Sequence, residues 1–370
     1  MPEIFRAVVT TVRSGKLNED STAYHFVLTI FMLFSLVIIG VWSSGHFAHA
    51  LYFGHNSSII ASSQSPLISS QIAATEKGNV YVVWGDKNYI FSSSSQDNGT
   101  KFSVPILLSN SNKLASSPQI AATEKGDVYV VWVDKNSTGG NSDIKFRSSN
   151  DSGKSFGGAK KLQGGNIISS SPQIAATKRG DVYVVWVDKD GISGDTDIKF
   201  RSSNDSGRSF DNGKRLSVRN DILSSSPQVA ATKEGNVYVV RVDKNSISGE
   251  IDIVIRVSTD SGQNFSNGLN LNEDPIEMPI SSPQIAATEN GYAYVVWYQN
   301  DVHFKEILDD GATLGRTVFP GNSTSSTSSP QIAATEKGDV YVVWVDKKSP
   351  NKDSILALKR IGEFFIAPNS

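Results

Sequence analysis

One stretch in the second half of this sequence carries polar residues whose types could bind a ligand. Arg241 stands where five related segments carry a Trp, and the acidic stretch NEDPIEMP follows at residues 272–279. A guanidinium suits carboxylate recognition because its planar fork matches both oxygens. Either the sequence has simply diverged here, or these residues form a local polar pocket. The candidate binding residues of that pocket are Arg241, Asp274, Glu277, Tyr298 and His303.

Oxygen-bearing side chains also recur beside glycine in three loops. Ca²⁺ takes six to eight oxygen ligands, so alternating carboxylates and amides can suit it. No EF-hand spacing is present, and solvated hairpin loops are the simpler interpretation of the same residues. No pair of His residues has metal-ligand spacing on a strand, so a transition-metal site is not expected. The candidate Ca²⁺ ligands are Asp134, Asn136, Asp143, Asp188, Asp190 and Asp197, and the third loop carries Asp243, Asn245 and Asp252.

A third pattern, Ser-x-Asp-x-Gly-x-x-Phe, occurs four times and predicts a self-contained hairpin turn. The Asp carboxylate can accept backbone N–H groups, the Ser hydroxyl adds a local bond, and Gly takes a positive φ. The Phe is expected to pack under the turn against a sheet. The four copies are Ser95, Asp97, Gly99, Phe102; Ser149, Asp151, Gly153, Phe156; Ser203, Asp205, Gly207, Phe210; and Ser258, Asp260, Gly262, Phe265.

The composition limits the elements that can position these residues. With 35 Lys plus Arg against 37 Asp plus Glu, the chain has no basic field that would attract nucleic acid. The absence of Cys excludes disulfides, thiolate nucleophiles and thiolate metal sites. With only 3 Met but 17 Phe and 11 Tyr, the composition favours β-branched and aromatic packing. An all-β protein is predicted.

The N-terminal region predicts export. Residues 26–42 contain no charge and would span roughly 26 Å as a helix, close to the hydrocarbon core of a membrane. Three cations precede this run and none follows until Lys77, which places residues 1–25 in the cytoplasm and the rest outside. The sequence from Ala48 to Ala50 could instead be a signal-peptidase site, so the protein is either membrane-anchored or secreted. Seven Asn-x-Ser/Thr sequons are compatible with export: Asn56, Asn98, Asn136, Asn150, Asn204, Asn264 and Asn322.

Six copies of one unit fill most of the remaining chain. The string QIAAT or QVAAT recurs at intervals of 48, 54, 55, 56 and 47 residues, each time followed by a Gly turn and then by VYVVW or a variant of it. Two strands joined by a tight turn form a hairpin. The second strand is apolar on both faces and must be covered on both, whereas DIKFR, at 143–147 and 197–201, alternates apolar with cationic residues. Each unit therefore predicts about four strands of falling burial.

This gradient predicts a six-bladed β-propeller over residues 61–370. The first strand carries small residues, as propeller blades require near the axis where they converge. The ring would be closed either by residues 51–60, within the linker at 43–60, or by the C-terminal EFFIAP segment. The connections that lead into the first strands repeat Ser and Gln and would form a polar ring. This ring suits a glycan or a surface protein, and its connections are Pro118-Gln119, Pro172-Gln173, Pro227-Gln228, Pro283-Gln284 and Pro330-Gln331.

The Ser-x-Asp-x-Gly-x-x-Phe motif resembles the Asp box, or bacterial neuraminidase (BNR) repeat, of the sialidase-like propellers. The resemblance covers roughly residues 60–370. In that family the boxes are structural and lie at the blade periphery, away from the active site. The resemblance therefore implies that these Asp residues maintain the fold and do not catalyse. The fifth unit has only Asp309, Asp310 and Gly311, and the sixth has no box.

The resemblance also raises the possibility of sialidase chemistry, for which the family uses an arginine triad, a tyrosine nucleophile activated by a glutamate, and an aspartate acid/base. This sequence has no Arg between Arg13 and Arg147. Arg147, Arg201 and Arg256 occupy one repeated position and cannot converge on a single ligand. The tyrosines of the second strands are likewise one repeated core position: Tyr81, Tyr129, Tyr183, Tyr238, Tyr294 and Tyr341. No catalytic residue is assigned.

The sequence thus predicts an exported cell-surface propeller that serves as a recognition or scaffold module, glycan binding included, without sialidase catalysis. An exo-glycosidase of the exo-α-sialidase type is one alternative, and a structural component of the cell envelope is another. The expected partners are a membrane, through the N-terminal helix, and a glycan or surface protein. Nucleic acid is not expected.

Overall fold

The computed structural model describes residues 60–61, 67–86, 88–109, 114–135, 140–163, 167–191, 193–217, 222–272, 280–288, 291–308, 313–318, 329–335, 338–349, 352–361 and 364–366. All regular secondary structure in this part of the chain is β-strand, as predicted. The predicted membrane segment at 26–42, the segment before it and nearly all of the linker at 43–60 lie outside the described residues. Within the described residues, none forms a helix with the length and apolarity to cross a membrane.

Two compact units divide the chain, and each is treated separately. Unit 1 comprises residues 1–139, 145–160 and 369–370, and unit 2 comprises residues 140–144 and 161–368. Strands β1 to β6 therefore belong to unit 1, and β9 to β24 to unit 2, with β7 and β8 divided between the two.

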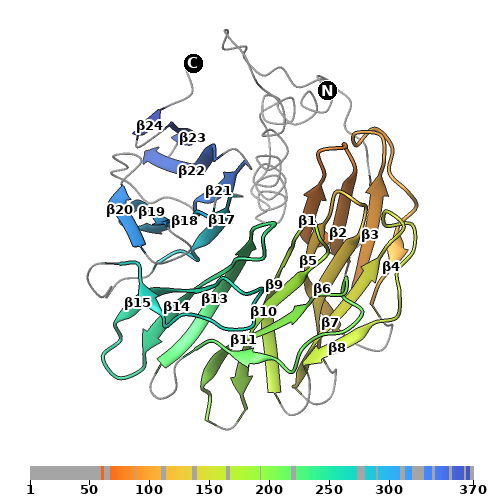
Figure 1. The fold of residues 1–370 in the computed structure, drawn as a ribbon, viewed down its shortest axis with the longest axis horizontal. Helices are drawn as coiled ribbons and strands as arrows, with labels where there is room; N and C mark the ends of the chain where they lie inside the picture. Colours follow the sequence, from red (N-terminus) through yellow and green to blue (C-terminus); the bar gives the residue numbers. More distant parts are fainter. Residues whose placement is uncertain are drawn as a thin grey trace. The chain divides into compact units, whose positions relative to one another are not determined.

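Six groups of four consecutive strands follow one another along the described chain (Figure 1). The first contains β1 (Leu67–Ala74), β2 (Val80–Asp86), β3 (Tyr89–Ser95) and β4 (Ile106–Leu107). The second contains β5 (Leu114–Ala122), β6 (Val128–Lys135), β7 (Ser142–Ser149) and β8 (Lys160–Gln163). The third contains β9 (Ile167–Ala176), β10 (Val182–Asp190), β11 (Thr196–Ser203) and β12 (Lys214–Arg215).

The remaining three groups lie in unit 2. The fourth contains β13 (Ile222–Ala231), β14 (Val237–Asn245), β15 (Ile251–Ser258) and β16 (Leu269–Asn270). The fifth contains β17 (Gln284–Ala287), β18 (Ala293–Gln299), β19 (Asp301–Leu308) and β20 (Thr313–Val318). The sixth contains β21 (Gln331–Ala334), β22 (Val340–Ser349), β23 (Lys352–Ile361) and β24 (Phe364–Ile366).

Consecutive strands within each group pair antiparallel, which confirms the prediction of about four strands per repeat. A single parallel bridge between Ser142 and Ile168 joins the second and third groups into one eight-stranded sheet. The C-terminal strand β24 pairs with its neighbour β23 and so completes the sixth group. Each group described here is thus assembled from its own stretch of sequence, without a strand exchanged from the other terminus.

The second strand of each repeat carries the core. Every residue from Val128 to Asp134 of β6 is buried, and β10 shows the same pattern from Val182 to Asp188. Both faces are covered because each sheet packs against its neighbours in the unit: Val185 and Phe200 of the third group share a cluster with Val239 of the fourth. The VYVVW strands are apolar on both faces because both faces are covered, as the sequence predicted.

First strands of successive groups lie next to one another within each unit, β1 beside β5 in unit 1 and β9, β13, β17 and β21 in sequence in unit 2. Four of them contain a β-bulge just before the repeated Gln, as between Ser225 and Gln228. At the bulge a serine adopts a left-handed φ of 49° to 51°. We call these four residues the bulge serines: Ser69, Ser117, Ser171 and Ser226.

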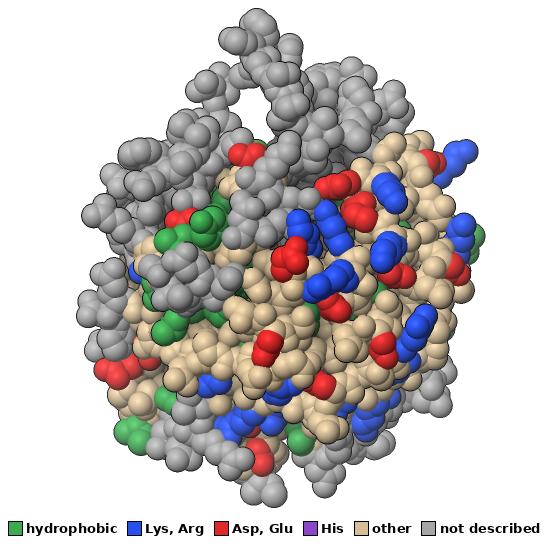
Figure 2. Space-filling view, viewed as in Figure 1, with side chains coloured by type: hydrophobic (Ala, Val, Ile, Leu, Met, Phe, Trp, Pro, Cys, Tyr) green, Lys and Arg blue, Asp and Glu red, His purple; other side chains and the backbone are tan. Residues whose placement is uncertain are grey.

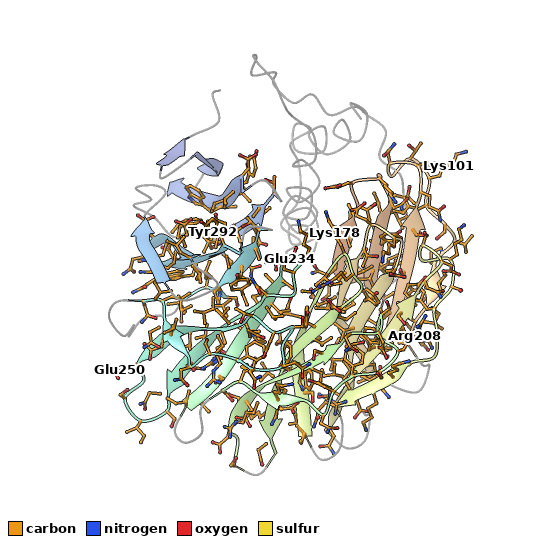
Figure 3. All side chains as sticks on the ribbon, in the orientation of Figure 1. Lys101, Lys178, Arg208, Glu234, Glu250 and Tyr292 are labelled. Atoms are coloured by element: carbon orange, nitrogen blue, oxygen red, sulfur yellow. The ribbon has the colours of Figure 1, made fainter. Side chains whose placement is uncertain are left out.

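The two ends of a group differ. At one end the turn between the first and second strands bonds to the turn between the third and fourth, since Ser261 N–H donates to the Gly235 carbonyl at 3.1 Å. We call this the Asp-turn end. At the other, the loop end, the first strand begins beside the end of the second, where Ile222 pairs with Asn245. Figure 3 shows Glu234 and Glu250 near opposite ends of β14.

Candidate functional site

The four Ser-x-Asp-x-Gly-x-x-Phe segments form self-contained turns, which we call the Asp turns. In the third group Ser203 Oγ donates to Asp205 Oδ1 at 2.7 Å and accepts the Gly207 N–H at 2.9 Å. Asp205 Oδ1 also accepts the Ser209 N–H at 2.8 Å. In the fourth group Phe265 packs edge-on against Phe200 of the third, with ring centroids 4.8 Å apart. The Asp turns are therefore built from their own hydrogen bonds, as the motif predicted.

These local bonds stabilise the ionised carboxylates. At Asp260 the N–H of Asn264 is the leading cause, and it holds the pKa at about 2 against a desolvation effect in the opposite direction. At Asp151 and Asp205 partial desolvation opposes the shift, yet hydrogen bonds from Ser155 and Ser209 still bring each pKa to about 2. A carboxylate that remains ionised at every ordinary pH is a poor general acid. The Asp turns thus have the electrostatics of structural turns.

A donor in the second strand bonds a carboxylate two residues later. Trp132 Nε1 donates to Asp134 Oδ1 at 2.9 Å, and Trp186 Nε1 donates to Asp188 Oδ1 at 2.7 Å. Ser169 Oγ adds a bond of 2.6 Å to Asp188 Oδ1. Burial raises the pKa of Asp188, and these two hydrogen bonds oppose that shift.

In the fourth group Arg241 takes the place of the Trp and keeps the same acceptor. Its Nε lies 2.9 Å and 3.0 Å from the two carboxylate oxygens of Asp243, and its Nη2 lies 2.8 Å from Oδ2. Ser224 Oγ donates to the same carboxylate at 2.6 Å. Arg241 is completely buried, and its Nη1 has no acceptor within the part of the chain that the structure describes.

Arg256 on β15 lies on the same face of the sheet as Arg241 on the neighbouring strand β14. Burial lowers the pKa of Arg256, and the charge of Arg241 adds to this effect. The face is tightly packed: a Cβ on Gly268 would lie 2.8 Å from Val254 Cγ1 and 3.6 Å from Arg241 Nη2. The guanidinium of Arg241 is therefore enclosed by the protein, and a ligand would need a local opening to reach it. Its assignment to ligand binding stays a prediction.

The other predicted members of that pocket are spread over the fifth group. His303 on β19 stacks on Trp297 with ring centroids 5.1 Å apart, and burial lowers its pKa. Tyr298 on β18 is partly buried, and its N–H donates to Ser281 Oγ at 2.9 Å. Asp274 and Glu277 lie outside the described residues, so the pocket itself is untested.

The carboxylates predicted for Ca²⁺ have protein partners. Asp143 forms an ion pair with Lys161 Nζ at 3.0 Å. Asp197 forms ion pairs with Arg215 and with Lys199, and it also accepts Ser217 Oγ at 2.9 Å.

Asp190 Oδ1 accepts the Ser193 N–H at 3.1 Å. Asn136 lies outside the described residues. Within the described ranges, no three His, Asp or Glu side chains converge as a metal site would require. The Ca²⁺ assignment therefore stays a prediction.

A surface of a different kind lies along the first strands. The glutamine after each bulge is half-buried, and Gln173 and Gln228 make no side-chain hydrogen bond to other described residues. The neighbouring strands are linked at the bulge, where Ser282 Oγ donates to Ser226 Oγ at 3.2 Å. Sequence reasoning identified this Ser and Gln face but not the bulge that shapes it. The recurring Ser-Ser before the Gln was the available signal.

Charge is mixed over the surface. In Figure 2 acidic and basic side chains are interspersed on the face that is shown. This distribution agrees with the balanced composition and offers no single-sign field on that face.

Comparisons with known proteins give the fold. No protein-family model matches the sequence, and no curated protein resembles it significantly. Among solved structures, the Hadza microbial sialidase Hz136 superposes with a TM-score of 0.51 and 11% identity over 75% of this chain. This chain spans 63% of that sialidase.

Two further similar structures act on other glycans. A PL25 ulvan lyase gives a TM-score of 0.54 at 13% identity, covering 78% of each chain. The GH93 α-L-arabinofuranosidase of Fusarium graminearum, solved with arabinobiose, gives 0.54 at 13% identity over 80% of this chain and 92% of the enzyme. At such identities the likeness concerns the fold: this chain is all-β, similar to carbohydrate-active propeller proteins.

Proposed function

We propose that this protein is an exported six-bladed β-propeller of the sialidase-like type that recognises glycans along its first strands, at the glutamines that follow the bulges, without sialidase catalysis. The N-terminal run at 26–42 either tethers it to the membrane or is cleaved near Ala50. The proposal of export rests on the sequence alone.

One observation carries the binding proposal. Gln173 and Gln228 are half-buried amides on adjacent strands, and neither makes a side-chain hydrogen bond to the described residues. Each amide offers two donor hydrogens and an acceptor oxygen, which is the chemistry that sugar hydroxyls need. Placing two of them a strand apart gives a rigid pair of contacts.

The bulge serines support this assignment. A non-glycine residue in the left-handed region costs on the order of 1–2 kcal/mol, and such strain collects where the backbone is shaped for a task. Four groups repeat the same strained serine two residues before the glutamine. The backbone therefore has the same local shape just before the glutamine in these four groups.

A glycan array tests the proposal. The full chain, or its export product, is applied with Ca²⁺ and with a chelator, and the array is then analysed for released terminal sugars. We expect retention of a defined glycan and no release. A double variant, Gln173→Ala with Gln228→Ala, should lower affinity at least tenfold, about 1.4 kcal/mol.

Arg208→Ala is the matched control, because Arg208 is exposed in the Asp turn of the same unit and should leave binding unchanged. Release of a terminal sugar would contradict the absence of catalysis and favour the exo-glycosidase alternative. Absence of all binding would contradict glycan recognition and favour an envelope scaffold. Loss of binding in chelator alone would support the predicted Ca²⁺ ligands.

A further inference from the structure

The Asn-x-Ser/Thr sequons can be sorted by the environments of their acceptor side chains. Four acceptors lie within the described residues, and all four are exposed and belong to an Asp turn or its immediate continuation: Asn98, Asn150, Asn204 and Asn264. A sugar attached to any of them would project from the Asp-turn end. The four differ in what their amide groups contact in the folded protein.

Asn150 and Asn204 are equivalent and unengaged. Each follows a buried serine, Ser149 or Ser203, that is 3% or 4% exposed. Each Asn is the first residue after its strand, β7 or β11, and its side chain is exposed. Neither amide has a hydrogen bond with any other described residue. No contact of either Asn amide has to be given up for a sugar to be attached there, and the engaged group of the Asn150 sequon is Ser152, whose N–H donates to the Gly126 carbonyl at 3.1 Å.

Asn98 and Asn264 are engaged. The amide oxygen of Asn98 lies where a Cβ on Gly78 would be, so this side chain packs against the glycine backbone. Asn264 Nδ2 donates to Asp260 Oδ2 at 2.8 Å, and the hydroxyl of its sequon residue, Ser266, accepts the Val257 N–H at 3.0 Å. Attachment of a sugar at either position would compete with contacts that hold a turn together.

We propose that Asn150 and Asn204 carry N-linked glycans, one on each compact unit. The donor would be a lipid-linked oligosaccharide. The Asn Nδ2 forms a bond to the anomeric carbon of the sugar, the bond from that carbon to the lipid phosphate oxygen breaks, the lipid phosphate leaves with the electron pair, and one amide proton passes to a base of the transferase. This inference rests on the export in the proposed function.

The position of these glycans has a consequence for recognition. Both would stand at the Asp-turn end, whereas Gln173 and Gln228 belong to the first strands, close to the bulges. The glycans would therefore follow the third strands β7 and β11, whereas the glutamines lie on the first strands β9 and β13.

Peptide mapping by mass spectrometry tests the proposal on the full chain isolated from cells that export it with N-linked glycosylation. We expect oligosaccharide on the peptides that contain Asn150 and Asn204, with low occupancy at Asn98 and Asn264. Asn150→Gln and Asn204→Gln should each remove the mass of one glycan from the intact protein, and the double variant should remove two. Asn98→Gln and Asn264→Gln are the matched controls and should leave the mass of attached sugar unchanged.

Each other result overturns the inference. Unmodified Asn150 and Asn204 peptides in an exported chain would refute it. Equal occupancy at all four positions would show that the folded structure does not select the acceptor. Protease protection of residues 61–370 in intact cells would show that the chain is not exported, which overturns both this inference and the proposed localisation, whereas the glycan array reports on recognition independently.

Discussion

The third and fourth strand groups, β9 to β12 and β13 to β16, are similar in sequence, and one of the positions at which they differ is buried in the second strand. In the third, Trp186 donates one hydrogen bond to Asp188. In the fourth, Arg241 grips the equivalent Asp243 through two nitrogens and is fully buried. A neutral donor in one group is replaced by a charged donor in the other without a change in strand register.

The comparison shows that the carboxylate is the constant partner and the donor is the variable one. The fifth group provides the reverse case, because Gln299 stands where the carboxylate would be, and Trp297 Nε1 is buried without an acceptor among the described residues. A single unpaired indole N–H is tolerable, whereas an unpaired buried guanidinium is far more costly. The Asp therefore matters more in the fourth group than in the third.

The largest effect is expected when that carboxylate is removed from the fourth group. Asp243→Ala leaves the Arg241 charge buried and uncompensated, which should lower the free energy of unfolding by about 3–5 kcal/mol. Asp188→Ala, the matched change in the third group, should lower it by about 1–3 kcal/mol because only neutral donors lose an acceptor. Denaturant unfolding with hydrogen exchange of the β10 and β14 amides measures both. Equal losses would refute the comparison.

Replacing Arg241 with the Trp of the other groups should raise the free energy of unfolding. Arg241→Trp recreates the bond from an indole N–H to the carboxylate that the third group has. Replacement of a buried ion pair by packed apolar residues often leaves stability unchanged or raises it. We expect a gain of about 2 kcal/mol, measured by the same unfolding experiment. The glycan array sharpens the result: unchanged binding would assign Arg241 to the fold, whereas lost binding would support its predicted place in a polar pocket. A marked loss of stability would contradict the comparison.

A smaller difference is expected at the tyrosines of the same two strands. Tyr238 Oη donates to the Gly291 carbonyl at 2.7 Å, so Tyr238→Phe leaves a buried carbonyl without this donor and should cost about 1 kcal/mol. Burial raises the pKa of Tyr183 to about 12, and the neighbouring Ser261 hydroxyl opposes that shift. Because the buried Tyr183 hydroxyl has no well-formed hydrogen bond to the described residues, Tyr183→Phe should cost less. Thermal unfolding of the two variants measures the difference.

The smallest expected effect is a pH dependence of stability that the third and fourth groups share. The folded pKa of Asp205 and of Asp260 is about 2, below the ordinary value of 3.8. The stabilisation that these two ionised carboxylates give to the folded state is therefore fully present above pH 4 and is lost as the pH falls through about 2. Asp260 is exposed and Asp205 is partly exposed, so water screens both carboxylates and each contributes a few tenths of a kcal/mol to the free energy of unfolding. Melting temperatures from pH 5 to pH 2 should fall less steeply in Asp205→Asn and Asp260→Asn; parallel curves would contradict this origin.

Much of the fold could be predicted because its signals are local and repeated. The VYVVW strands, the Gly turns and the Asp turns each follow from propensity and pattern, and all are present in the structure. The partners of single polar residues could not be predicted in this way. The pairing of Arg241 with Asp243 depends on side-chain directions along one strand, and the bulge at Ser226 is a register shift for which the recurring Ser-Ser is only an indirect signal.

The candidate site was predictable only in part for the same reason. The sequence identified the face with Ser and Gln, but whether Gln173 is free or bonded is decided by its neighbours in space. The carboxylates of Asp134 and Asp188 showed an alternation that suits Ca²⁺, yet the side chains of Trp132 and Trp186 bond to them. Alternation along a strand does not distinguish a ligand set from a row of structural acceptors.

The retained carboxylate also constrains the order in which this chain could have evolved. Trp and Arg codons differ by a single base, so an ancestral Trp at position 241 could become Arg in one mutation while Asp243 was already present to receive the charge. Loss of the Asp first, as in a repeat like the fifth, would have closed that route, because the incoming cation would have had no counterion in the core. Each Trp and Asp pair that survives among the repeats is therefore a position where a buried charge can still be acquired.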